Sequence, residues 1–216
     1  MRAWARDGRF VLEDVADEAA DVVAGLGFSQ EGESWVRSFP ADARYADAAA
    51  RRFVTCAEAL VRQAAGSEPA PWEETLETLL ARTGGDGWWL AGSAAVAVRG
   101  GAVSPRDLDL ISDADGCVQL AAVVSDLLIE PFAGGGYLGA WWLRGFAGAR
   151  FECVGGVHAS VDDGEAPSDF GPVAGSRLET VEWRGHRVRV PPLDLQLQVS
   201  ERRGLEERAR AIRALV

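Results

Sequence analysis

The stretch from Trp88 to Ser112 constrains the fold more than any other part of this chain. Trp88 to Ala91 is a short apolar run behind a glycine-rich turn, and it predicts a buried strand. Gly92-Ser93 follows directly, and the small residues Ala94 to Val98 predict a short helix that ends at Gly100-Gly101. A strand that bends through glycine into a helix leaves backbone N–H groups free to bind an anion.

Fourteen residues after Ser93 comes Asp107-Leu108-Asp109, which continues into the apolar pair Leu110-Ile111. Side chains alternate along a strand, so this pattern places Asp107 and Asp109 on one face, about 7 Å apart. Two carboxylates at that spacing repel each other unless a cation neutralises them. Carboxylate oxygens are also good ligands for a divalent cation. The pattern therefore predicts a strand with a metal-binding edge.

A third acid interrupts a later apolar run. Ala149 to Val157 predicts a strand antiparallel to Tyr137–Arg144, and it contains Glu152. A carboxylate inside an apolar strand is costly unless it is paired or binds a metal. Glu152 is therefore a candidate third ligand. The alternative is a residue that faces solvent or pairs with Arg150 or Arg144.

Gly-Ser, about a dozen residues, Asp-x-Asp and a later strand carboxylate together resemble the nucleotidyltransferase superfamily. That superfamily includes DNA polymerase β, the aminoglycoside nucleotidyltransferases and the minimal nucleotidyltransferases of toxin–antitoxin operons. The resemblance covers about residues 85 to 200 and implies an α+β fold, with a mixed, largely antiparallel sheet and flanking helices. It also implies an ATP-binding or other nucleotide-binding transferase, and the lack of a membrane span and of a secretory signal makes a cytoplasmic location the default expectation.

The resemblance assigns roles to individual residues. Gly92 and Ser93 would cradle the phosphates of a nucleoside triphosphate, while Asp107, Asp109 and Glu152 would be the catalytic carboxylates and hold Mg²⁺ or Mn²⁺. A hydroxyl acceptor would then attack the α-phosphorus and pyrophosphate would leave. Arg106 could neutralise the leaving charge at the nucleotide, or it could simply anchor the end of the strand at the surface.

Composition excludes several other classes of protein. The net charge is −11, with a pI of about 4.7, so no extended nucleic-acid-binding face is expected. All 22 basic residues are arginine, which excludes Walker-A and Schiff-base lysines. The three cysteines have no C-x-x-C spacing, so zinc sites and structural disulfides are not expected. No apolar run is long enough for a transmembrane helix, and the first residues lack a secretory signal.

The sequence predicts two parts: a mostly helical extension with a small hairpin over residues 1–84, and a nucleotidyltransferase-like domain over residues 85–216. Within the first part we expect helices over 10–26, 41–65 and 72–82, with the hairpin over 28–39. In the second part, a helix follows the Asp-x-Asp strand and a hairpin spans 178–190. Residues 162–172 form a polar loop, and two helices end the chain. Arg202 or Arg203 in the last of these could face the nucleotide.

Two readings of function stay open from the sequence. The first is an enzyme that modifies a hydroxyl on a small molecule, a protein or an RNA end. The second is a catalytically inactive module of the same fold, such as an antitoxin, that acts through a protein partner. In the simplest alternative to both, Gly92-Ser93 is only a tight turn and the Asp-x-Asp pair only a strand end.

Overall fold

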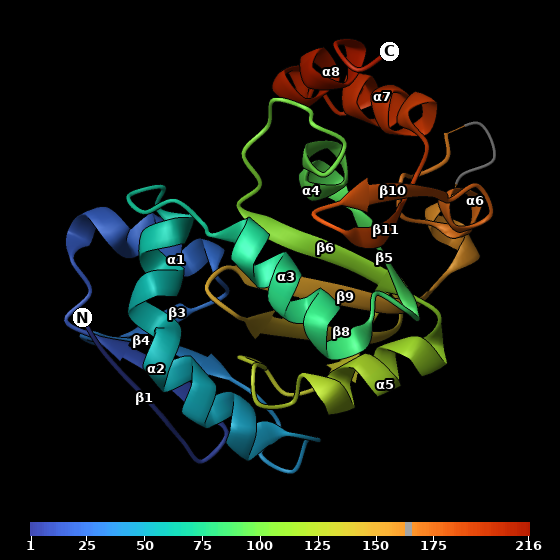
Figure 1. The fold of residues 1–216 in the computed structure, drawn as a ribbon. Coiled ribbons are helices and arrows are strands. Elements are labelled where there is room, and N and C mark those ends of the chain that lie inside the picture. The colour runs from blue at the N-terminus through green and yellow to red at the C-terminus, as the bar shows by residue number, and fades with distance from the viewer. Residues whose placement is uncertain (163–165) are drawn as a thin grey trace.

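The computed structural model describes residues 1–162 and 166–216, and these form an α+β protein with three sheets (Figure 1). The predicted class, a mixed sheet with flanking helices, is confirmed. The predicted loop over 162–172 falls partly on residues 163–165, which lie outside the described residues. None of the helices in the described ranges combines the length and hydrophobicity needed to cross a lipid bilayer.

The first 38 residues are rich in strand rather than helix, so the prediction of a mostly helical extension is wrong there. They form a four-stranded antiparallel sheet in the order β1-β2-β4-β3, with one short helix, α1. The predicted helix over 10–26 is replaced by β2 and α1, while the predicted hairpin over 28–39 is present as β3 and β4. The elements are β1 (Arg2–Arg6), β2 (Arg9–Glu13), η1 (Asp17–Ala19), α1 (Ala20–Gly25), β3 (Ser29–Glu31) and β4 (Ser34–Ser38).

Two helices lead from this sheet to the rest of the chain, as the sequence predicts. They are α2 (Ala46–Ala64) and α3 (Trp72–Thr83). Phe53 of α2 packs against Phe10 and Phe28 in the core of the N-terminal part. Leu76 and Leu79 of α3 instead belong to the main core of the molecule. The domain boundary at residue 84 stays a prediction.

A five-stranded sheet in the order β5-β6-β9-β8-β7 forms the centre of the molecule (Figure 1). β6 pairs antiparallel with β5 and parallel with β9, while β8 pairs antiparallel with β9 and β7. The elements in this part are β5 (Trp88–Ala91), α4 (Gly92–Ala97), β6 (Asp107–Ser112), α5 (Ala114–Val123), β7 (Ala133–Gly134), β8 (Gly139–Phe146) and β9 (Arg150–Val157).

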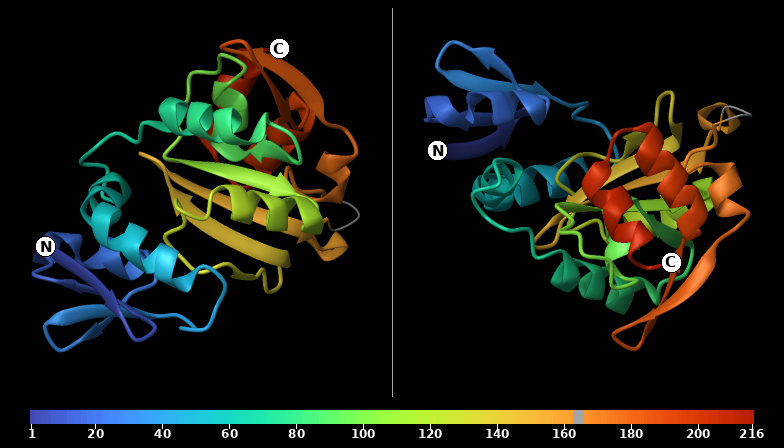
Figure 2. Two further views of the ribbon diagram at one scale, coloured as in Figure 1. Left: turned by 60° about the horizontal axis from the view of Figure 1, so that its bottom comes forward. Right: turned by 90° about the horizontal axis from the view of Figure 1, so that it is seen from above.

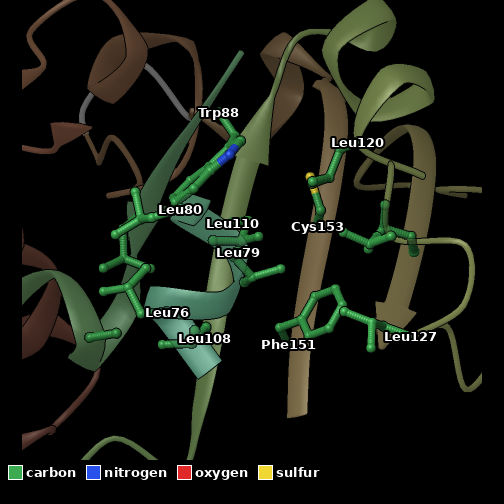
Figure 3. Packing of buried hydrophobic residues seen from close by; sticks show 14 of the residues in the cluster. Leu76, Leu79, Leu80, Trp88, Leu108, Leu110, Leu120, Leu127, Phe151 and Cys153 are labelled. Carbon is green, nitrogen blue, oxygen red and sulfur yellow. The ribbon is translucent and has the colours of Figure 1, made fainter. Parts of the chain in front are cut away.

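One face of this sheet is covered by α3 and α5 and holds the main core. Leu108, Leu110, Phe151 and Cys153 point from β6 and β9 into this core, where Leu76 and Leu79 of α3 and Leu120 of α5 meet them (Figure 3). Alternation along β6 and β9 therefore turns Asp107, Asp109 and Glu152 to the opposite face. The buried apolar residues thus fix the direction in which the acids point.

In the C-terminal part, helices cover that opposite face, while the hairpin over residues 179–190 contributes Trp183, Val188 and Val190 to the main core. The elements of this part are η2 (Ala159–Val161), α6 (Pro172–Gly175), β10 (Glu179–Trp183), β11 (His186–Val190), α7 (Leu193–Arg202) and α8 (Glu206–Arg213). Leu195 and Val199 of α7 pack on Trp89, Ala91 and Ile111 of the sheet. Figure 2 shows α7 and α8 on the far side of the molecule from the N-terminal sheet. The hairpin and the two helices confirm the predictions for this region.

Candidate active site

The bend between β5 and α4 has the geometry that the sequence predicts. Gly92 is the first residue of α4 and has a φ of +63°, a conformation that residues with a Cβ rarely adopt. A Cβ on Gly92 would collide with Oδ2 of Asp109. Glycine is therefore needed twice here, once for the backbone angle and once for the close approach of the carboxylate.

The three predicted acids lie on two neighbouring parallel strands. Asp107 and Asp109 are two residues apart on β6, and Glu152 of β9 is directly opposite Asp109 in the strand register. Residues in register on neighbouring strands face the same side of a sheet. Glu152 is distant from Asp109 in the sequence, but the pairing of β6 with β9 places the two acids side by side.

The proximity of these acids affects the pKa of Asp109. Burial, as the largest cause, and the negative charges of Asp107 and Glu152 together raise this pKa to about 7, while Arg150 acts in the opposite direction. Asp109 has no hydrogen bond or ion pair with any residue in the described ranges. Among the three acids, Asp109 is therefore the one that contacts no counter-ion in the described part of the chain.

The other two acids are paired with arginines. Asp107 contacts Nη2 of Arg150, and Oε1 of Glu152 lies 2.7 Å from Nε of Arg144 and 3.4 Å from Nε of Arg150. The alternative raised from the sequence, that Glu152 pairs with Arg144 or Arg150, is therefore present in the structure. Among the described residues, no group of three or more His, Cys, Asp or Glu side chains is arranged to hold a metal ion.

The chemistry of these side chains nevertheless fits a divalent cation. Mg²⁺ and Mn²⁺ prefer carboxylate oxygens and need only one or two of them when a phosphate supplies further ligands. Asp109 and Asp107 offer these oxygens, and the mutual repulsion of the acids favours a bound positive charge. The ligand roles of Asp107, Asp109 and Glu152 stay predictions.

A wide groove with a volume of about 1070 Å³ runs from the bend to α8. Gly92, Ser93, Asp107 and Asp109 line one side, and arginines of the C-terminal part line the other. The predicted residue Arg106 also lines this groove and has no ion-pair partner in the described part of the chain. The arginines opposite are Arg203, Arg208 and Arg210. Arg202 instead donates a hydrogen bond to the carbonyl oxygen of Pro167.

A smaller cavity of about 250 Å³ adjoins the groove at Gly92 and Asp109. Glu152 lines it, together with apolar and aromatic residues from four segments of the chain. These are Leu110, Ile111, Leu138, Trp142, Val154 and Phe170. A molecule bound in this cavity would lie against two of the three acids.

Sequence reasoning missed two charged residues at this cavity. Asp169 and Arg208 form an ion pair, and both are buried, with 3% and 9% of their surface exposed. They come from the loop before α6 and from α8, so only the tertiary fold brings them together. No local motif links the two residues, so they could not be predicted as site residues from the sequence.

No protein-family model and no curated protein matches this chain. A candidate nucleotidyltransferase from Thermotoga maritima is similar in structure, with 18% identity, coverage of 65% of this chain and 89% of that chain, and a TM-score of 0.48. The lincosamide antibiotic adenylyltransferase LnuA, with lincomycin bound, is 11% identical, covers 69% of this chain and 100% of its own, and has a TM-score of 0.49.

A third similar structure is ANT(2'')-Ia in complex with adenylyl-2''-tobramycin. It is 18% identical over 65% of this chain and 87% of its own, with a TM-score of 0.42. At such identities and TM-scores, the activity of this chain has to be argued from its own residues.

Proposed function

We propose that this chain is a nucleotidyltransferase, which moves a nucleoside monophosphate from a nucleoside triphosphate to a hydroxyl group. The observation that carries the proposal is the gathering of Asp107, Asp109 and Glu152 beside the bend at Gly92. Like charges in a partly buried place destabilise the fold. Such a cluster is expected where a function requires it.

The larger groove suits the triphosphate. Gly92 and Ser93 at the start of α4 line it, and so do Arg203 and Arg210 of the C-terminal part. Hydroxyl, amide and guanidinium groups are the usual donors to phosphate oxygens. Arg106 lies beside Asp107 in the same groove and can neutralise charge on the leaving pyrophosphate.

The smaller cavity suits the acceptor, because Asp109 and Glu152 lie at one end and Trp142 and Phe170 supply apolar surface. In the proposed reaction the acceptor oxygen forms a bond to the α-phosphorus. The bond from that phosphorus to the bridging oxygen of pyrophosphate breaks, and Glu152 takes the hydroxyl proton. A divalent cation held by the three acids would neutralise the phosphate charge as this happens.

The test measures nucleotide binding first and turnover second. Binding of each of the four ribonucleoside triphosphates is titrated with and without Mg²⁺, and pyrophosphate release is then measured with a panel of hydroxyl compounds. Lincomycin and tobramycin belong in the panel, since they occur in the similar structures, as do RNA 3′ ends and protein acceptors. The Asp107→Ala and Asp109→Ala variants should lose about 100-fold or more of the rate. Undiminished turnover in both would contradict the proposal.

A second candidate function is favoured by the arginine contacts of Asp107 and Glu152. Acids that already have counter-ions can be purely structural, as expected for a catalytically inactive module that binds a protein partner, such as an antitoxin. Tight binding to the product of a neighbouring gene, without affinity for any nucleotide in the presence of Mg²⁺, would support this candidate over the enzyme.

A further inference from the structure

We propose that Arg150 is a displaceable counter-ion, which holds Asp107 and Glu152 in the absence of a divalent cation and leaves Asp107 when a cation binds. The inference rests on the proposed function, because it takes these acids as the cation's ligands. It assigns to Arg150 a positioning role that the motif itself does not contain.

The contacts of Arg150 support this role directly. Arg150 is in register with Asp107 across the β6–β9 pair, and its guanidinium contacts Asp107 through Nη2 and Glu152 through Nε, at 3.4 Å from Oε1. One positive charge thus reaches two of the three proposed ligands. Arg150 also opposes the rise in the pKa of Asp109, so its charge acts on all three acids.

Arg144, by contrast, is fixed from both sides. Its Nη1 lies 2.6 Å from Oε1 of Glu130, and its Nε lies 2.7 Å from Glu152. Glu130 is held in turn by Arg37 of β4, at 2.5 Å. The side chains of Arg144, Glu130 and Arg37 are each about three quarters buried or more. Arg144 can therefore keep Glu152 in place when Arg150 moves.

Arg150 has room to move, because it lines a groove of about 290 Å³ between the N-terminal part and the sheet. The groove also contains Gln63, a residue that is 7% exposed. The side-chain oxygen of Gln63 is buried and accepts no hydrogen bond from the described residues. A guanidinium that leaves Asp107 would find space in this groove. The other lining residues are Val22, Gly25, Leu26, Leu60, Ala64 and Arg106.

The test is a titration of the full chain with Mn²⁺ alone, in which electron paramagnetic resonance measures the concentration of free Mn²⁺. Arg150→Gln removes the competing charge, so it should bind Mn²⁺ more tightly by about 5- to 150-fold, the usual range for coupled binding. Arg150→Lys keeps the charge and should stay close to wild type. Arg82→Gln, which removes an arginine paired with Asp126 on the surface, should leave the affinity unchanged.

A second measurement follows the wild-type protein itself. Addition of Mg²⁺ should shift the side-chain Nε–H resonance of Arg150 in a nitrogen-edited NMR spectrum and leave that of Arg144 nearly in place. This measurement keeps the proposal testable if Arg150→Gln does not fold. An unmoved Arg150 signal at saturating Mg²⁺ would overturn the proposal, as would unchanged or weaker Mn²⁺ binding by a folded Arg150→Gln.

The outcomes separate this inference from the proposed function. If wild type releases pyrophosphate but Arg150→Gln shows no gain in Mn²⁺ affinity, the role of Arg150 is wrong and the enzyme stands. If Arg150→Gln gains affinity but no triphosphate is turned over, Arg150 competes with a cation at a site that is not a transferase centre. If neither protein binds Mn²⁺, the inference is overturned.

Discussion

Gly92 is the residue where backbone conformation and site chemistry depend on each other most closely. Its φ of +63° and the nearness of Asp109 Oδ2 both exclude a side chain. Gly100, at the other end of the same helix, has a φ of +88° but open space where a Cβ would lie. The two glycines therefore form a matched pair for mutation.

The Gly92→Ala and Gly100→Ala variants should both lose about 1–2 kcal/mol of unfolding free energy, the cost of a left-handed alanine. Only Gly92→Ala forces the Asp109 side chain to rotate, so only this variant should weaken Mn²⁺ binding, by about tenfold or more. Urea unfolding and Mn²⁺ titration measure the two effects. Equal Mn²⁺ affinity in both variants would show that the approach of Gly92 to Asp109 has no role in the site.

The raised pKa of Asp109 predicts a pH-dependent stability. Between the unfolded value near 3.8 and the folded value of about 7, the native state binds more protons than the unfolded state. Stability in the absence of a cation should therefore fall as the pH rises through this window and level off above it. The amide of the Asp109→Asn variant cannot ionise. The unfolding free energy of this variant should therefore exceed that of wild type at pH 8 by on the order of 1–4 kcal/mol.

Urea unfolding of both proteins at pH 5 and pH 8 without divalent cations measures this difference. The gap between wild type and Asp109→Asn should be wider at pH 8 than at pH 5. A gap that does not change with pH would mean that Asp109 titrates normally and that the three acids do not crowd one another.

The site residues differ in how much of the chain is needed to predict them. Asp107 and Asp109 share a face because strands alternate, and Gly92-Ser93 marks the bend, so a short segment suffices to predict them. Glu152 is identifiable as an acid in an apolar strand. The pairing of Asp107 with Arg150 depends on the parallel register of β6 and β9, and this register is a property of the whole sheet.

At the scale of elements, α8 is attached to the site by a buried ion pair. Arg208 of α8 binds Asp169, and Arg213 of the same helix binds Glu201 at 2.5 Å with both side chains about half exposed. A buried carboxylate that loses its partner keeps its desolvation cost, whereas an exposed one is solvated again. The two arginines should therefore differ strongly in their contribution to stability.

Arg208→Leu should lower the unfolding free energy by about 3–5 kcal/mol, while Arg213→Leu should change it by no more than about 1 kcal/mol. Urea denaturation gives both values. In the double variant Arg208→Leu with Asp169→Leu, much of the loss should be recovered, because no buried charge remains. Comparable losses for the two single variants would contradict the assignment of Arg208 and Asp169 as a buried pair.

Elements with a periodic pattern are predictable from this sequence, and elements that depend on non-local pairing are less so. α2 and α3 show apolar stripes at helical spacing, and both are present. Val11 also fits helical spacing with Val15, Ala19 and Val22, yet Phe10, Val11 and Leu12 are buried consecutively in β2. Phe10 and Leu12 pack in the cluster that contains α2, while Val11 is buried on the other face of the strand, so the pattern of β2 carries no alternation.

At the scale of the whole molecule, a chain of alternating charges joins the N-terminal sheet to the site. It runs from Arg37 of β4 through Glu130 and Arg144 to Glu152 of β9. The helix α2 makes parallel connections, because Arg52 and Gln63 donate hydrogen bonds to the carbonyl oxygens of Phe146 and Gly148 in the β8–β9 turn. The N-terminal part is thereby held against the strands that carry the acids.

Hydrophobic packing stabilises this contact between the N-terminal part and the central sheet more than the polar contacts do. Phe53 of α2 is 3% exposed and packs with Phe10 and Phe28 of the N-terminal part, in a cluster that also contains Ile129 and Phe146 from the central sheet region. Its neighbour Val54 is 42% exposed. A cluster shared between both parts should make them unfold together.

Phe53→Ala should therefore destabilise the whole chain by about 3–5 kcal/mol in one transition, since it opens a cavity in the shared cluster. Val54→Ala should stay within about 0.5 kcal/mol of wild type. Far-ultraviolet circular dichroism reports on the helices, and tryptophan fluorescence reports mainly on the chain beyond α2, where six of the eight tryptophans lie. The unfolding midpoints from the two signals should shift together to a lower urea concentration. An early circular dichroism loss in Phe53→Ala with an unmoved fluorescence midpoint would show that the N-terminal part unfolds alone, and it would then contribute no stability to the strands that hold the acids.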